Sequence, residues 1–172
     1  MKYIAGTTAI CLLSACLGGG GGTSVSTSSS NNPVSAPTPS VNVPTPPQPQ
    51  NFAGMLNNVR ASNRAGAVSF DARLGRAAQA HANDMLANNF FSHTGSDGSN
   101  VGQRVARQGY QYRTVGENIA RGYQTEESVM EGWTNSPGHH ANNINPNFED
   151  FGLARAGSGS NRYWVLVLGA ER

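Results

Sequence analysis

The side chains able to do acid–base or metal chemistry in most of this chain are histidines, carboxylates and serines, because both cysteines lie within the first 16 residues. His93 follows Phe90-Phe91-Ser92 and precedes a Gly/Ser/Asp-rich stretch, and His139 and His140 follow Ser136-Pro137-Gly138. We expect these three histidines in loops at the ends of elements, where functional groups tend to lie. His81 falls on an alanine-rich helical face and is predicted to be a packed or partly exposed helix residue.

One glutamate stands out beside these histidines. Glu117 lies in Gly116-Glu117-Asn118-Ile119-Ala120, next to apolar residues and with no adjacent lysine. No sequence-local metal motif joins it to the histidines, and spacing alone does not place them in one site. Ser92 and Ser136 are sequence neighbours of His93 and His139, which is weak evidence for a serine–histidine pair.

The N-terminus has the pattern of a secretory signal. A positive start is followed by an apolar run from Ile4 to Ala15, which is shorter than the roughly 20 residues that span a bilayer. The run ends in Leu13-Ser14-Ala15-Cys16, which resembles a bacterial lipobox. That resemblance implies cleavage of residues 1–15 and a lipid on Cys16, which would anchor the protein to a membrane. The alternative is a plain secreted protein in which Cys16 is incidental.

Residues 16–50 are predicted to be a flexible tether. They are rich in Gly, Ser, Thr and Pro and contain neither aromatic nor charged residues, so they cannot bury enough apolar surface to fold. A passive spacer is favoured over a proline-rich ligand, although Pro44 and Pro47 have the PxxP spacing. The formal charge of the whole chain is only +2, with Lys2 as its one lysine, so we expect no nucleic-acid partner.

Residues 51–172 are predicted to form one α+β domain. Apolar spacing predicts helices over 52–64, from 72 onward with Asp71 as N-cap, over 99–108 and over 126–135, where Pro137 and Gly138 end the last one. The second helix should bury one face, made of Leu74, Ala77, Ala78, His81, Met85 and Leu86. Residues 152–168 read as a β-hairpin whose second strand is central and buried on both faces. The expected architecture is an antiparallel sheet covered by helices.

Six segments occur in the order found in one known family: Phe90-Phe91-Ser92-His93, Asp97-Gly98, Gly116-Glu117-Asn118-Ile119-Ala120, Trp133-Thr134-Asn135-Ser136-Pro137-Gly138-His139, Phe151-Gly152-Leu153 and Tyr163-Trp164-Val165. In this order they resemble the CAP superfamily of cysteine-rich secretory, antigen 5 and pathogenesis-related proteins, and its compact bacterial SCP-like branch in particular. The resemblance covers essentially all of residues 52–172.

The resemblance implies an α-β-α sandwich with a central antiparallel sheet and a cleft that takes up a divalent metal, most often Zn²⁺. Mapped onto this chain, it assigns His93, Glu117 and His139 as metal ligands. The family's further acid commonly follows the tryptophan, but Thr134-Asn135-Ser136 contains none. Glu131 is a substitute in that role, and His140 is either an accessory group or an exposed residue.

Two functions are compatible with this reading. The resemblance favours a binding module on the cell envelope that holds a lipid, peptide or glycan. The alternative is a metal-dependent hydrolase of envelope or extracellular peptides, with Glu117 as general base. A purely structural role is the third option.

Leu17 is not the Asp that marks inner-membrane retention, so in a Gram-negative cell the outer membrane is the expected location. Ligand class and oligomeric state stay open.

Overall fold

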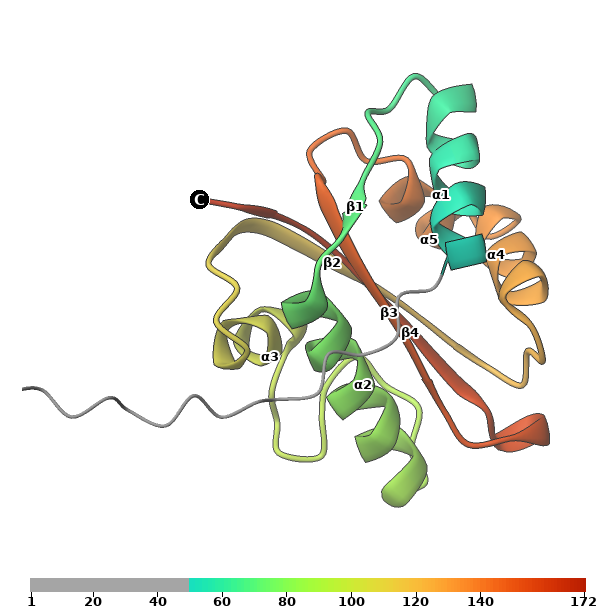
Figure 1. Cartoon of the computed structure of the whole chain (residues 1–172). Helices are drawn as coiled ribbons and strands as arrows, with labels where there is room; N and C mark the ends of the chain where they lie inside the picture. Colours follow the sequence, from blue (N-terminus) through green and yellow to red (C-terminus); the bar gives the residue numbers. More distant parts are fainter. Residues whose placement is uncertain (1–49) are drawn as a thin grey trace, which may run out of the picture. The chain divides into compact units, whose positions relative to one another are not determined.

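The computed structural model describes residues 50–172, so the predicted signal peptide, the lipidated Cys16 and the tether lie outside the described part of the chain. Within that part, no helix has both the length and the apolar character needed to cross a membrane. Helices and strands alternate irregularly along the domain (Figure 1): α1 Gln50–Ser62, β1 Ser69–Phe70, α2 Ala72–Ala87, α3 Val101–Arg107, β2 Tyr112–Arg121, α4 Glu126–Thr134, α5 Pro137–Asn143, β3 Asp150–Ala156, a short 3₁₀ turn Gly159–Asn161 and β4 Tyr163–Glu171.

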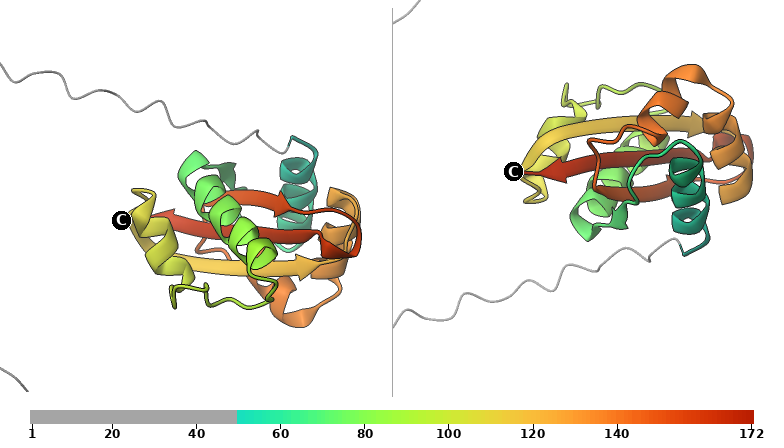
Figure 2. Two further views of the ribbon diagram at one scale, coloured as in Figure 1. Left: turned by 90° about the horizontal axis from the view of Figure 1, so that it is seen from below. Right: turned by 90° about the horizontal axis from the view of Figure 1, so that it is seen from above.

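The four strands form one sheet in the order β1-β3-β4-β2. The three long strands are antiparallel, as predicted, whereas the two-residue β1 pairs with β3 in parallel. Helix α2 lies across one face of the sheet, and α1 and α4 lie on the other side (Figure 2). The predicted α+β sandwich is confirmed, and β2 is an edge strand.

Strand β4 explains why the core has two halves. Side chains of a strand point alternately to opposite faces. Trp164, Leu166 and Leu168 enter the core under α1 and α4, whereas the alternating Tyr163, Val165 and Val167 enter the core under α2. The prediction of a central strand buried on both faces is therefore confirmed.

Helix α2 begins where its cap was predicted. The Asp71 carboxylate accepts hydrogen bonds from the backbone N–H groups of Arg73 and Leu74, which would otherwise be unpaired in the first turn. The expected buried face is correct except at its end, because Leu86 is 39% exposed. The last turn of α2 meets the β3–β4 turn at Gly157 and no longer covers the strands.

Two elements differ from the sequence-based expectation. His139 and His140 lie in helix α5 and not in a loop, because Pro137 occupies the first turn, where a missing N–H needs no partner. Pro-Gly therefore ends α4 and also begins α5. Strand β2 was not predicted, because Gly116-Glu117-Asn118 has low strand propensity. Its buried polar side chains are held by partners from other elements.

Candidate functional site

Three elements bring the predicted site residues together. His93 comes from the loop after α2, Glu117 from the edge strand β2 and His139 from α5. His93 and His139 line the same open cleft, which has a volume of about 600 Å³. Glu117 lies behind this cleft and is not among its lining residues. The loop and the helix thus approach the edge of the sheet from two sides.

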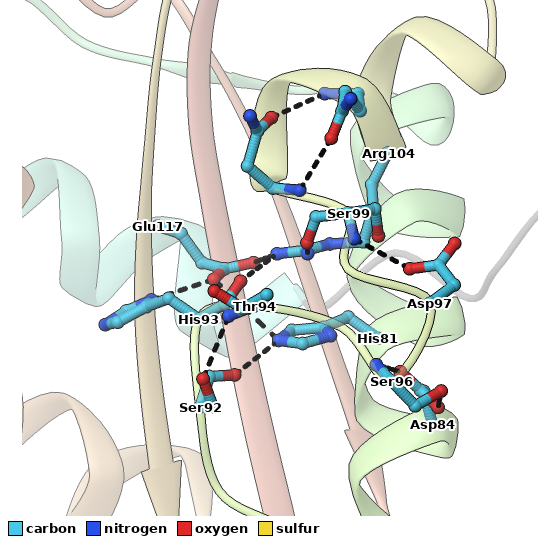
Figure 3. A network of polar contacts seen from close by, with 12 residues as sticks. His81, Asp84, Ser92, His93, Thr94, Ser96, Asp97, Ser99, Arg104 and Glu117 are labelled. Atoms are coloured by element: carbon cyan, nitrogen blue, oxygen red, sulfur yellow. Dashed lines mark hydrogen bonds and ion pairs between the residues drawn. The ribbon is translucent and has the colours of Figure 1, made fainter. Parts of the chain in front are cut away.

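Glu117 is almost completely enclosed, since only 2% of its side chain is exposed. Its Oε1 lies 2.9 Å from His93 Nδ1, and its Oε2 accepts a hydrogen bond of 2.7 Å from Arg104 Nη2 (Figure 3). Arg104 is itself held by the carbonyl oxygens of Ser99 and His93 at 2.8 and 3.1 Å. Both carboxylate oxygens are therefore engaged, and the buried negative charge has a positive partner in direct contact.

The contact with Glu117 also fixes the orientation of His93. A carboxylate accepts hydrogen bonds, so the arrangement favours the proton on Nδ1 and leaves Nε2 as a lone-pair donor. The His93 side chain is 60% exposed and lines the open cleft, while its Nδ1 faces Glu117. A histidine that donates one ring N–H to a carboxylate is the usual arrangement behind a metal-binding or basic imidazole.

His81 contacts the same carboxylate from the protein interior, 3.9 Å from Glu117 Oε1. It is 1% exposed, and its Nε2 donates to the Ser92 carbonyl at 2.9 Å. Burial lowers the pKa of His81, and the nearby Arg104 lowers it further, whereas Glu117 acts in the opposite direction. Of the two expected environments, packed or partly exposed, the structure shows the packed one, and it places His81 against Glu117.

His139 is oriented by a hydroxyl group. Its Nδ1 lies 2.9 Å from Ser136 Oγ, and its backbone carbonyl accepts from Asn118 Nδ2 at 3.0 Å, which ties α5 to β2. Partial burial lowers the pKa of His139, and the nearby His93 lowers it further. The two histidines are therefore close enough to repel each other when both are charged.

Aromatic residues make up much of the cleft wall. Phe91 is 49% exposed and Tyr123 is 37% exposed, and Trp133 closes the back with its indole N–H bonded to the Ile119 carbonyl. Tyr123 lies tightly over Gly132, where an added Cβ would clash with the tyrosine hydroxyl. The glycine at position 132 thus allows this wall to form.

The available metal-binding atoms differ from the predicted set. Among residues 50–172, no group of three or more His, Asp or Glu side chains is arranged to hold a metal ion. Glu117 is turned toward His93 and Arg104, which leaves His93 and His139 as the residues of the cleft lining that carry an imidazole. Two neutral imidazoles suit Zn²⁺, but catalytic zinc sites usually have three protein ligands. The donor set therefore fits a metal that completes its coordination with water or ligand.

The remaining site predictions have different outcomes. Glu131 is exposed on α4 and does not line the cleft, and neither does the half-buried His140. Sequence reasoning missed Arg104, since an arginine within a short amphipathic helix carries no signal that it will reach a glutamate on a later strand. It also missed the contact of His81 with that glutamate.

Comparison with known proteins finds a matching family for the domain. The sequence profile of the CAP, or cysteine-rich secretory protein, family matches residues 53–168. The uncharacterized protein YkwD of Bacillus subtilis is 35% identical over 106 residues, which is 62% of this chain and 41% of YkwD. The chain thus spans less than half of that relative.

Three solved structures are similar to the domain. An extracellular SCP-domain protein of Bacillus anthracis is 25% identical, with a TM-score of 0.66 over 71% of this chain and 40% of its own. An outer surface protein of Borrelia burgdorferi has the same TM-score at 22% identity, over 72% and 92%. NaASP2, solved with Zn²⁺, shares the fold at 17% identity with a TM-score of 0.51, over 72% and 79%.

Proposed function

This chain belongs to the cysteine-rich secretory protein family, and from that premise we propose that its domain is a ligand-binding module of the cell envelope. In this proposal, His93 and His139 hold a divalent metal at the open cleft, and Zn²⁺ is the first candidate. The metal would act as a Lewis acid toward an oxygen or nitrogen atom of the ligand. The aromatic walls would contact the rest of the ligand.

One observation carries the proposal: each cleft histidine has its Nδ1 engaged by another side chain. Glu117 engages His93, and Ser136 engages His139. In each ring, Nε2 is then the nitrogen that no side chain within residues 50–172 engages. Such partners of the second ring nitrogen fix imidazole orientation and support metal binding. NaASP2, which shares the fold, has been solved with Zn²⁺.

The proposal gives Glu117 a positioning role. A general base must reach the proton that it removes, and both oxygens of Glu117 are paired behind the cleft wall. This favours binding over hydrolysis by a Glu117-activated water. Anchoring through a lipid on Cys16 belongs to the same proposal, and the extracellular and outer-surface relatives support an envelope location.

Zinc titration of the full chain tests the metal site, with calorimetry as the readout. Wild type should bind one Zn²⁺, and His93→Ala and His139→Ala should each abolish or greatly weaken binding. Ser136→Ala should weaken it by about 10-fold or more, as for other groups that orient a ligand. His140→Ala is the matched control, because this adjacent histidine does not line the cleft. Equal binding by all variants, or none by wild type, would overturn the proposal.

A further inference from the structure

Part of the cleft floor is the edge of the sheet. β2 pairs with β4 on one side only, because the strand order ends at β2. Residues 119–121 of β2 line the cleft. The outer edge of β2 therefore borders the cleft.

The pairing with β4 fixes the direction of each backbone group of β2. In an antiparallel ladder, alternate residues exchange hydrogen bonds with the partner strand, and the residues between them direct N–H and C=O away. The Gly122 N–H donates to the Arg162 carbonyl at 2.8 Å. Two residues before Gly122, Ala120 also directs its backbone N–H and C=O toward β4. Ile119 and Arg121, which alternate with these residues, direct their N–H and C=O groups outward.

Two observed hydrogen bonds agree with this alternation. The Ile119 carbonyl accepts from Trp133 Nε1 at 3.3 Å, and the Glu117 carbonyl accepts from Asn142 Nδ2 at 3.3 Å. Both acceptors belong to the outward-facing set. No partner within residues 50–172 satisfies the Ile119 N–H or the N–H and C=O of Arg121. These two donors and one acceptor belong to residues of the cleft lining.

We propose that the ligand of this cleft is an extended peptide that adds to the edge of β2 as a further strand. This inference rests on the proposed function, because it identifies the ligand class of the same cleft. Main-chain pairing supplies affinity in this mode, and pockets for alternate side chains supply specificity. A glycan or a fatty acyl chain has no row of alternating amide donors and acceptors to match the outward groups of Ile119 and Arg121.

The cleft walls provide places for the side chains of such a peptide. Successive side chains of a strand point to opposite faces. Phe91 and Tyr123 are the exposed aromatic residues of the lining, and they are available to apolar side chains.

The charge of the lining favours an acidic residue in the peptide. Arg121 is the one permanently charged lining residue, and no Asp or Glu lines the cleft in the described part of the chain. The Arg121 guanidinium is held over the Tyr163 ring, 4.9 Å from its centroid, and donates to Asn161. It has no ion-pair partner within residues 50–172, so it is available to a carboxylate.

A hexapeptide library displayed on phage and selected on the full chain provides the probe. The strongest binder is then synthesised with a single N-methyl group at each position in turn. N-methylation removes one N–H from the peptide. We therefore expect the affinity to fall by about five-fold or more when every second residue, whose N–H pairs with β2, is methylated, and to change little at the residues between them. An affinity profile without this alternation would overturn the proposal, and so would the absence of any binder.

A pair of variants tests the strand edge itself. Arg121→Pro removes an outward N–H that makes no ladder bond, which an edge strand tolerates, and Arg121→Ala removes the same side chain but keeps the N–H. The peptide should bind Arg121→Pro about five-fold or more weakly than Arg121→Ala. The Ile119 amide should also gain hydrogen-exchange protection on peptide binding. Equal affinity for the two variants would contradict strand addition.

The outcomes separate this inference from the proposed function. Zinc binding that depends on His93 and His139, without any peptide binding, would leave the metal module standing and remove the peptide ligand. Alternating sensitivity to N-methylation without zinc binding would leave the peptide site standing and remove the metal.

Discussion

The buried ion pair of Arg104 and Glu117 should be among the most sensitive points of the domain. Its N–O distance is 2.7 Å, and the two side chains are 7% and 2% exposed. Removing one partner leaves the other charge buried and uncompensated, which typically costs about 3–5 kcal/mol. We therefore expect Arg104→Met to lower the free energy of unfolding by about 3 kcal/mol or more. Glu117→Gln should cost somewhat less, since the amide oxygen still accepts a hydrogen bond.

The chain offers a matched control at its surface. Arg113 and Glu149 form a pair of the same residue types at 2.6 Å, but the two side chains are 51% and 60% exposed. Exposed pairs contribute about 0–1 kcal/mol, so Arg113→Met should change stability by less than about 1 kcal/mol. The two pairs differ mainly in burial.

Urea unfolding of the full chain measures these differences, with the variants compared at equal m values. A double-mutant cycle isolates the pair: Arg104→Met with Glu117→Gln should cost less than the sum of the single changes, by about 1–3 kcal/mol. A cost below about 1 kcal/mol for Arg104→Met, or strict additivity, would refute the conclusion that Arg104 neutralises a buried Glu117.

Three further predictions concern the scaffold. The guanidinium of Arg60 is fully buried and donates to four backbone carbonyls, so Arg60→Met should cost about 3 kcal/mol or more in urea unfolding; a loss under about 1 kcal/mol would contradict this. Gly152→Ala should sharply lower the melting temperature, because its Cβ would clash with the backbone of α2 at Leu74 and Gly75. Gly54→Ala has open space around it and should be neutral or stabilising by up to about 1 kcal/mol. Burial lowers the pKa of His81 below its ordinary 6.5, so its contribution to stability is present above that value and is lost as pH falls. In chelator-containing buffer, the free energy of unfolding should fall less steeply below about pH 6.5 in His81→Gln than in wild type, by up to about 1.4 kcal/mol per pH unit. An unchanged slope would contradict the lowered pKa of His81.

Local sequence signals were sufficient for several elements of the fold. The Asp71 cap, the apolar spacing of the second helix and the hairpin ending in β4 all depend on residues close in sequence. Strand β2 was not predictable in this way, because its buried Glu117 and Asn118 are stabilised by groups 13 to 25 residues away. The helical position of His139 was missed because Pro137 was interpreted only as a helix stop.

The functional site also combines residues that sequence motifs identified with contacts that only the tertiary structure shows. Ordered motifs identified His93, Glu117 and His139, and the fold brings two of them to one cleft with the third directly behind. Their roles depend on which atoms face one another, and that information is tertiary. Only the positions of His93 and Arg104 show that Glu117 has no free oxygen, and only the register of β2 against β4 shows which backbone groups point away from β4.

Ring-nitrogen NMR of the histidines during a zinc titration tests the central claim most directly. The account predicts that the Nε2 signals of His93 and His139 shift together at one equivalent of Zn²⁺. The Nδ1 of His93 should stay protonated against Glu117, and the signals of His81 and His140 should change little. Loss of the proton from His93 Nδ1 on zinc binding, or no change at either cleft histidine, would contradict a site built from two oriented imidazoles.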